Sequence, residues 1–82
     1  MDNEKKLEYL KTKLPITTIA AYAFDDAFGA DIPEEDLTDR VAGILLAVAI
    51  ENLGDWSWAD CMDDMMCCYD IDFPTDEEEA VE

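Results

Sequence analysis

The chain contains no histidine and few of the other residues that carry out enzyme chemistry. Histidine is the commonest general acid and base, and it usually activates cysteine nucleophiles as well. The only serine, Ser57, lies outside any glycine-framed turn, and no glycine-rich phosphate loop is present. Paired carboxylates are frequent, but 22 acids in 82 residues produce such pairs by composition alone. We therefore predict that the protein is not an enzyme.

Motifs for metals and cofactors are also missing. The three cysteines contain no paired C-x-x-C spacing of the kind that holds zinc. The acids of residues 70–79 invite comparison with a calcium-binding loop, but Thr75 stands where that loop requires glycine and Pro74 stands at a ligand position. We predict no metal site and no cofactor.

Cysteine is scarce, and Cys61, Cys67 and Cys68 lie within eight residues, which does not suit a disulfide framework. The N-terminus lacks the basic-then-apolar pattern of a signal peptide. No apolar run approaches the roughly 18 residues that a membrane span needs. These absences predict a protein of the reducing cytoplasm that does not bind membranes.

Basic residues are few, and most of them lie together. Four lysines fall within residues 1–13, which carry a net charge of +1. Residues 14–82 contain 19 acids against Arg40 alone, for a net charge of −18. Such a surface repels nucleic acid and anionic membranes, and it attracts basic protein surfaces. The alternative is that the acids serve solubility alone, although a small domain needs a net charge magnitude of only about 2 to 8 for that purpose.

Hydrophobic periodicity predicts an all-α fold with four helices and no strand. The first helix is expected at about residues 3–13 and the second at about 16–28. The third is expected to begin between residues 33 and 38 and to end near residue 53, and the fourth covers about residues 56–69. A glycine follows the second and the third helix, where it can end each of them.

The third helix is apolar nearly all round, which is typical of a buried central helix. One face is formed by Val41, Ile44, Leu45, Val48 and Leu53, and the apolar surface is extended by Leu46 and Ile50. We expect this helix at the centre of one compact four-helix domain covering residues 1–74, followed by a solvated acidic tail at residues 75–82. The alternative is that the helix packs against a second copy of itself, which leaves a homodimer open.

A helical wheel divides the fourth helix into an apolar and an acidic face. The apolar face consists of Trp58, Met62, Met65, Met66 and Tyr69. The opposite face carries Asp60, Asp63 and Asp64, and Trp56 falls beside these acids at the first turn. A tryptophan in that place either contributes to binding, as aromatic residues often do, or folds back on the core.

Two clusters of acids are therefore predicted to bind a partner. The first consists of Asp55, Asp60, Asp63, Asp64 and Asp70 together with Trp56. The second consists of Asp31, Glu34, Glu35, Asp36 and Asp39. For each acid, the alternative is an ordinary solvated surface residue. Asp25 and Asp26 lie near the C-terminal end of the second helix, where negative charge is mildly unfavourable, and such conflicts are usually tolerated.

Residues 24–37 resemble part of an acyl carrier protein, in which an acidic helix ends in phenylalanine and a loop with isoleucine-proline and further acids follows. That resemblance implies a carrier whose serine holds phosphopantetheine. The family's Asp-Ser-Leu motif would place this serine at Leu14, whereas the only serine of the chain is Ser57.

In size, charge and helical content the chain also resembles the small acidic inhibitors encoded by phages and mobile elements, such as anti-CRISPR and anti-restriction proteins. That resemblance implies a DNA mimic that acts in the host cytoplasm without catalysis. Such a protein would occupy the basic surface of a nucleic-acid-binding protein or ribonucleoprotein effector, and it would not bind nucleic acid itself. The alternative function is an acidic adaptor or assembly subunit that docks on a protein partner through apolar helix faces.

Overall fold

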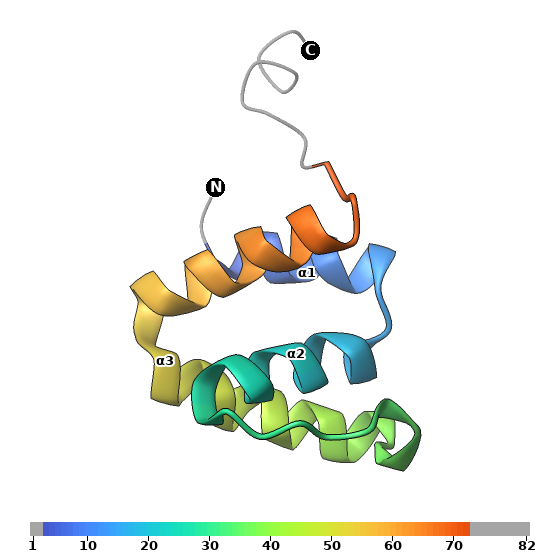
Figure 1. Ribbon diagram of the computed structural model, residues 1–82. Coiled ribbons are helices and arrows are strands. Elements are labelled where there is room, and N and C mark those ends of the chain that lie inside the picture. The colour runs from blue at the N-terminus through green and yellow to red at the C-terminus, as the bar shows by residue number, and fades with distance from the viewer. Residues whose placement is uncertain (1–2, 73–82) are drawn as a thin grey trace, which may run out of the picture.

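A computed structural model describes residues 3–72, which contain three α-helices, one short 3-10 turn and no strand. The elements are α1 (Asn3–Lys13), α2 (Ile16–Phe28), η1 (Glu34–Asp36) and α3 (Asp39–Cys68) (Figure 1). The predicted all-α fold class is confirmed. The expected tail at residues 75–82 and the expected domain end at residue 74 lie outside the described residues.

Residues 3–72 form three α-helices where four were predicted, because the expected third and fourth helices join at a kink into one element, α3. Within α3, Gly54 has φ 82° and ψ 170°, and no other residue of the helix has non-helical angles. This combination of angles is essentially restricted to glycine. The chain bends at Gly54, so α3 has a first half (residues 39–53) and a second half (residues 55–68).

A proline and a glycine determine where α1 ends and where α2 begins and ends. The N–H of Leu14 donates to the carbonyl of Leu10 at 2.8 Å, and Pro15 then adopts extended angles before α2 begins. Gly29 has φ 67°, and its N–H donates to the carbonyl of Asp25 at 2.7 Å. A left-handed glycine of this kind satisfies the last carbonyls of a helix. The bounds predicted for these two helices are therefore confirmed.

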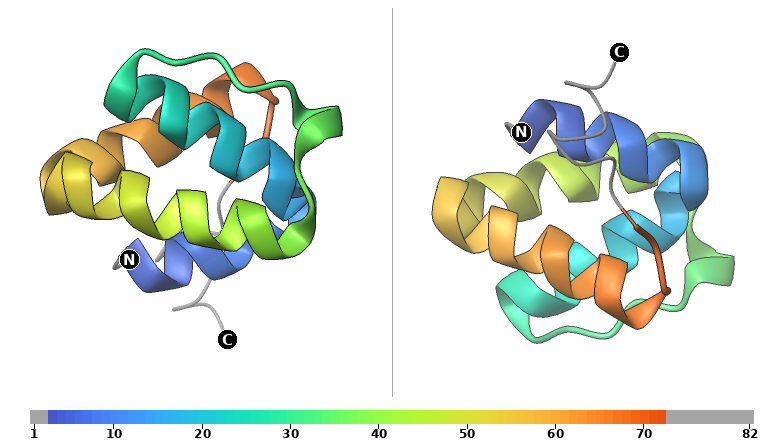
Figure 2. Two further views of the ribbon diagram at one scale, coloured as in Figure 1. Left: turned by 90° about the horizontal axis from the view of Figure 1, so that it is seen from below. Right: turned by 90° about the horizontal axis from the view of Figure 1, so that it is seen from above.

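The helices form two layers, which Figures 1 and 2 show from three directions. One layer holds α2 and the first half of α3, and the other holds α1 and the second half of α3. The bend at Gly54 carries the chain from one layer to the other. Asn3 Nδ2 donates to the carbonyl of Asp55 at 3.0 Å, and Tyr9 Oη donates to the carbonyl of Asp72 at 2.6 Å. These bonds link α1 to the start of the second half of α3 and to the segment that follows this helix.

The hydrophobic core lies between the layers. Trp58, Met62, Met65 and Met66 of the second half of α3 are buried as predicted, whereas Tyr69 is 43% exposed. The rest of the core is formed by Leu10, Ile19, Ala20, Ala23, Ala42, Leu46, Ala49 and Cys61.

The first half of α3 is not the buried central helix that its composition predicts. Ala42, Leu46 and Ala49 are buried against the core. The side chains of Val41, Ile44 and Val48 are 42%, 59% and 46% exposed. Small side chains on the inner side, together with the alanines of α2, let the two helices approach closely. That close approach fixes the rotation of the helix and leaves its larger aliphatic residues outside.

Candidate acidic interaction surface

Every residue predicted to bind a partner is exposed. These residues are Asp31, Glu34, Glu35, Asp36, Asp39, Asp55, Trp56, Asp60, Asp63, Asp64 and Asp70. Exposure alone does not make them one site, because their neighbours decide which of them can act together.

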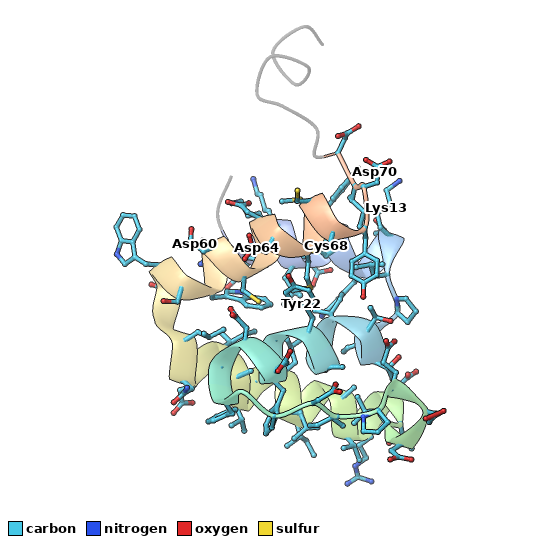
Figure 3. The ribbon with its side chains drawn as sticks, in the orientation of Figure 1. Lys13, Tyr22, Asp60, Asp64, Cys68 and Asp70 are labelled. Atoms are coloured by element: carbon cyan, nitrogen blue, oxygen red, sulfur yellow. The ribbon has the colours of Figure 1, made fainter. Side chains whose placement is uncertain are left out.

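Asp63 differs from the other acids of its helix because it is paired with a lysine of α1. Its Oδ1 accepts a hydrogen bond from Lys6 Nζ at 3.2 Å, and the Lys6 side chain is only 18% exposed. Figure 3 shows Asp60 and Asp64 one turn apart on the second half of α3, and Tyr22 reaching up from α2 toward the same half. The predicted row of three aspartates therefore divides into a pair and a single acid engaged with α1.

A polar junction joins α2 to the second half of α3. Cys61 is fully buried, and its pKa is raised to about 12. Burial is the largest cause, and the nearby carboxylates of Asp26 and Asp64 add to it. Tyr22 Oη lies 3.6 Å from Cys68 Sγ. This hydrogen bond, burial and nearby negative charge raise the pKa of Tyr22 above its ordinary value. Asp26 of α2 and Asp64 of α3 thus stand close to one buried thiol.

A shallow hollow of about 270 Å³ continues from this junction across α2 to the loop that precedes η1. It is lined by Thr18, Ala21, Tyr22, Asp25, Asp31, Ile32, Pro33, Glu34 and Tyr69. Thr18 is buried, and its Oγ1 donates to Glu34 Oε1 at 2.5 Å, which holds η1 against α2. The hollow therefore brings two acids of the loop region beside Asp25 of α2.

These neighbours define a surface that we call the acidic face. It consists of Asp25, Asp26, Asp31, Glu34, Asp60 and Asp64. Asp25 and Asp26 are absent from the predicted site, although one signal pointed to them. Two adjacent acids near the C-terminal end of a helix oppose its dipole, so a role at the surface could have been inferred. The acidic face can therefore present several carboxylates to a basic partner from helices that pack against each other.

The remaining predicted acids have other surroundings. Glu35 and Asp36 belong to η1 but do not line the hollow. Asp39 lies in the first turn of α3, where the helix dipole favours a negative charge. Asp70 follows the end of α3 with φ 57°, a left-handed conformation that aspartate tolerates better than most residues. The structure therefore gives Asp39 and Asp70 local roles in the fold.

Trp56 is 89% exposed, so it does not fold back on the core. It lies in the first turn of the second half of α3, directly after the bend, one turn before Asp60. A large aromatic side chain left in water beside acids is a feature of binding surfaces.

The lysines of α1 make local contacts. Lys11 Nζ lies 3.6 Å from Glu8 Oε2, and Lys13 Nζ lies 5.5 Å from the centre of the Tyr9 ring. Neither this ion pair nor the one between Lys6 and Asp63 involves a residue of the acidic face. Positive charge is therefore concentrated on α1, and the acidic face is built from the other elements.

Within residues 3–72, no group of three or more histidine, cysteine or acidic residues is arranged to hold a metal ion. No helix of this part of the chain has the length and apolar character needed to cross a membrane. The fold and the site define a small all-α protein with an acidic face. Comparison with protein-family models, with curated proteins and with solved structures finds no match to this chain.

Proposed function

We propose that this protein is a non-catalytic inhibitor that occupies a basic nucleic-acid-binding surface of a host defence complex, in the manner of anti-CRISPR or anti-restriction proteins. The observation that supports this function best is the acidic face, which gathers carboxylates from α2, α3 and the loop region on one surface. The two ion pairs described in the structure leave these carboxylates out. Their charge is therefore available to a basic partner.

The proposal follows from how proteins hold nucleic acid. Duplex DNA presents one negative charge per about 1.7 Å of axis, and its binding proteins meet it with arrays of lysine and arginine. Asp60 and Asp64 are one helical turn apart, a spacing that puts their Cβ atoms about 6 Å from each other. The hydrogen bond from Thr18 fixes Glu34 and so holds part of the face in place before binding. Preorganisation lowers the entropy lost on association, and opposite charge speeds the encounter.

The test is the displacement of nucleic acid from candidate targets. The purified chain is titrated into restriction enzymes and CRISPR effector complexes that hold fluorescent duplex DNA. We expect it to compete with DNA on one of them. The double variant Asp60→Asn/Asp64→Asn should weaken this competition by about 5- to 30-fold, since two ion pairs of roughly 0.5–1 kcal/mol each are lost.

The matched control is Glu35→Gln/Asp36→Asn, which removes the same charge from η1 outside the acidic face. We expect it to retain most of the competition. An equal loss in both variants would show that only total charge matters, and no loss in either would remove the acidic face from the site.

A second candidate function is an adaptor that docks through apolar side chains. It is favoured by the exposure of Trp56 at 89% and of the aliphatic residues along the first half of α3. For an adaptor we expect capture of a partner that Trp56→Ala weakens and that added salt barely changes. Competition for a DNA-binding surface should show the opposite pattern, because exposed ion pairs are screened by salt.

A further inference from the structure

An apolar strip runs along the outer side of the first half of α3. It consists of Val41, Ile44, Ala47 and Val48, all of which are exposed. No acid occurs from residue 40 to residue 50, although the chain as a whole carries a net charge of −17. Contiguous exposed apolar surface on a small protein commonly marks an interaction site.

The strip has opposite charges at its two ends. Arg40 precedes it and Glu51 follows it, and both are exposed. Eleven residues make about three helical turns, so the two side chains project from nearly the same side of the helix about 16 Å apart. Read along the helix, the surface is therefore positive, then apolar, then negative.

That order is self-complementary for two copies packed antiparallel. A two-fold axis crossing the helix near residue 46 places Arg40 of each subunit against Glu51 of the partner subunit. The same axis places Ile44 opposite Ala47 of the partner subunit, one residue from Val48 of the partner subunit. A two-fold interface requires this reciprocity: when a residue of one subunit contacts a second residue of the other, the second residue of the first subunit makes the same contact.

The surface beside the strip has a shape that suits this register. A hollow of about 320 Å³ is lined by Phe28, Val48, Glu51 and Asn52. Asn52 Nδ2 donates to the carbonyl of Ala27 at 3.1 Å, and this hydrogen bond holds the α3 side of the hollow against the end of α2. Ile44 is 59% exposed, and in the antiparallel register it stands opposite Ala47 of the partner subunit, directly beside the valine that lines the partner's hollow. Each copy thus supplies one projecting side chain and one hollow.

We propose that the apolar strip is the interface of a two-fold homodimer in which the first halves of α3 pack antiparallel. A second copy fits this surface better than an unrelated basic protein does, because the strip itself carries almost no net charge and matches its own reverse. None of the acidic-face residues belongs to the strip, and none lines the hollow beside it. The dimer therefore leaves both acidic faces exposed, and the inference does not rest on the proposed function.

Salt should affect this dimer in an unusual direction. Two copies with a net charge of −17 each repel one another, and added salt screens that repulsion. Three turns of one helix offer less area than the standard interface of about 800 Å² per partner, so we expect the dimer to be weak. The dimer should become tighter as salt rises, whereas binding through the acidic face should become weaker.

The experiment is sedimentation velocity on the full chain over a wide concentration range, at low and at high salt. We expect a species with twice the 9.2 kDa chain mass to appear with concentration and to increase with salt. Ile44→Glu should abolish it, and circular dichroism should confirm that this exposed position tolerates the change. Trp56→Ala, which changes an even more exposed apolar residue outside the strip, is the control and should dimerise normally.

Charge exchange tests the antiparallel register. Arg40→Glu should weaken the dimer by about 2- to 30-fold, because each dimer loses two exposed ion pairs. The double variant Arg40→Glu/Glu51→Arg should restore it. A chain that stays monomeric under all conditions, a dimer indifferent to Ile44→Glu, or a failed rescue would overturn the proposal. Capture of another protein through the strip by a monomeric chain would also overturn it and would favour the adaptor. None of these outcomes would alter the displacement of DNA expected from the acidic face.

Discussion

Replacing Gly54 with alanine tests the bend on which the two-layer arrangement depends. The angles of Gly54, φ 82° and ψ 170°, lie in a region where other residues are strained by about 1–3 kcal/mol. A Cβ atom built on Gly54 meets no neighbour within 4 Å. The cost therefore comes from the backbone angles and not from a clash. We expect Gly54→Ala to lower the free energy of unfolding by about 1–3 kcal/mol.

Gly43 provides the matched control. It lies inside the first half of α3, and a Cβ atom there also meets nothing within 4 Å. Glycine within a helix is less favourable than alanine by about 0.8–1.0 kcal/mol, so Gly43→Ala should stabilise the protein by that amount. The two variants make the same chemical change in the same element, and opposite signs would isolate the effect of the backbone angles.

Thermal unfolding followed by circular dichroism, at one low protein concentration, measures both variants. The midpoint temperature should shift by about 4–8 °C for each kcal/mol, upward for Gly43→Ala and downward for Gly54→Ala. A Gly54→Ala protein that melts higher than the parent would refute the reasoning. Residue 54 would then be helical, and a straight α3 could not occupy both layers.

Further predictions concern burial and pH. Because Cys61 is buried, a thiol reagent at neutral pH should titrate two of the three cysteines rapidly and the third only after unfolding, and three equal rates would contradict this. The raised pKa values of Cys61 and Tyr22 mean that the folded state holds these protons more tightly. Their stabilising effect is therefore complete below the ordinary pKa values of 9.0 and 10.0 and declines as the pH rises toward 12, which urea midpoints at increasing pH should reveal. Met65→Ala truncates a fully buried side chain and should cost about 2–5 kcal/mol, while Trp56→Ala should change stability by less than about 0.5 kcal/mol, as urea titrations can compare.

Proline and glycine at the helix ends explain why these ends could be predicted from sequence. Pro15 and Gly29 bound α2, and each acts through its own backbone preference without help from distant residues. Gly54 likewise predicts a break in the helix. Whether such a break separates two helices or bends one depends on how many residues leave the helical conformation. Here only Gly54 does, so α3 resumes at once and the expected fourth helix is its second half.

The inner side of the third helix could not be predicted, because apolar residues surround it. Selection of the side with Ala42 and Ala49 depends on the close approach of α2, which is a tertiary property. The same limit applies to the acidic face. The exposure of the acids follows from their charge, but Asp26 comes near the Cys61 thiol that Asp64 also approaches only because α2 packs against the second half of α3. No local pattern contains that contact.

The salt dependence of partner binding tests the central claim most directly. For an effector from which the chain displaces DNA, dissociation constants are measured between about 50 and 500 mM NaCl for the parent, Asp60→Asn/Asp64→Asn and Glu35→Gln/Asp36→Asn. We predict that the logarithm of the affinity falls linearly with the logarithm of salt, with a shallower slope for the acidic-face variant than for the other two proteins. An affinity that does not change with salt, or one slope shared by all three proteins, would contradict binding through the acidic face.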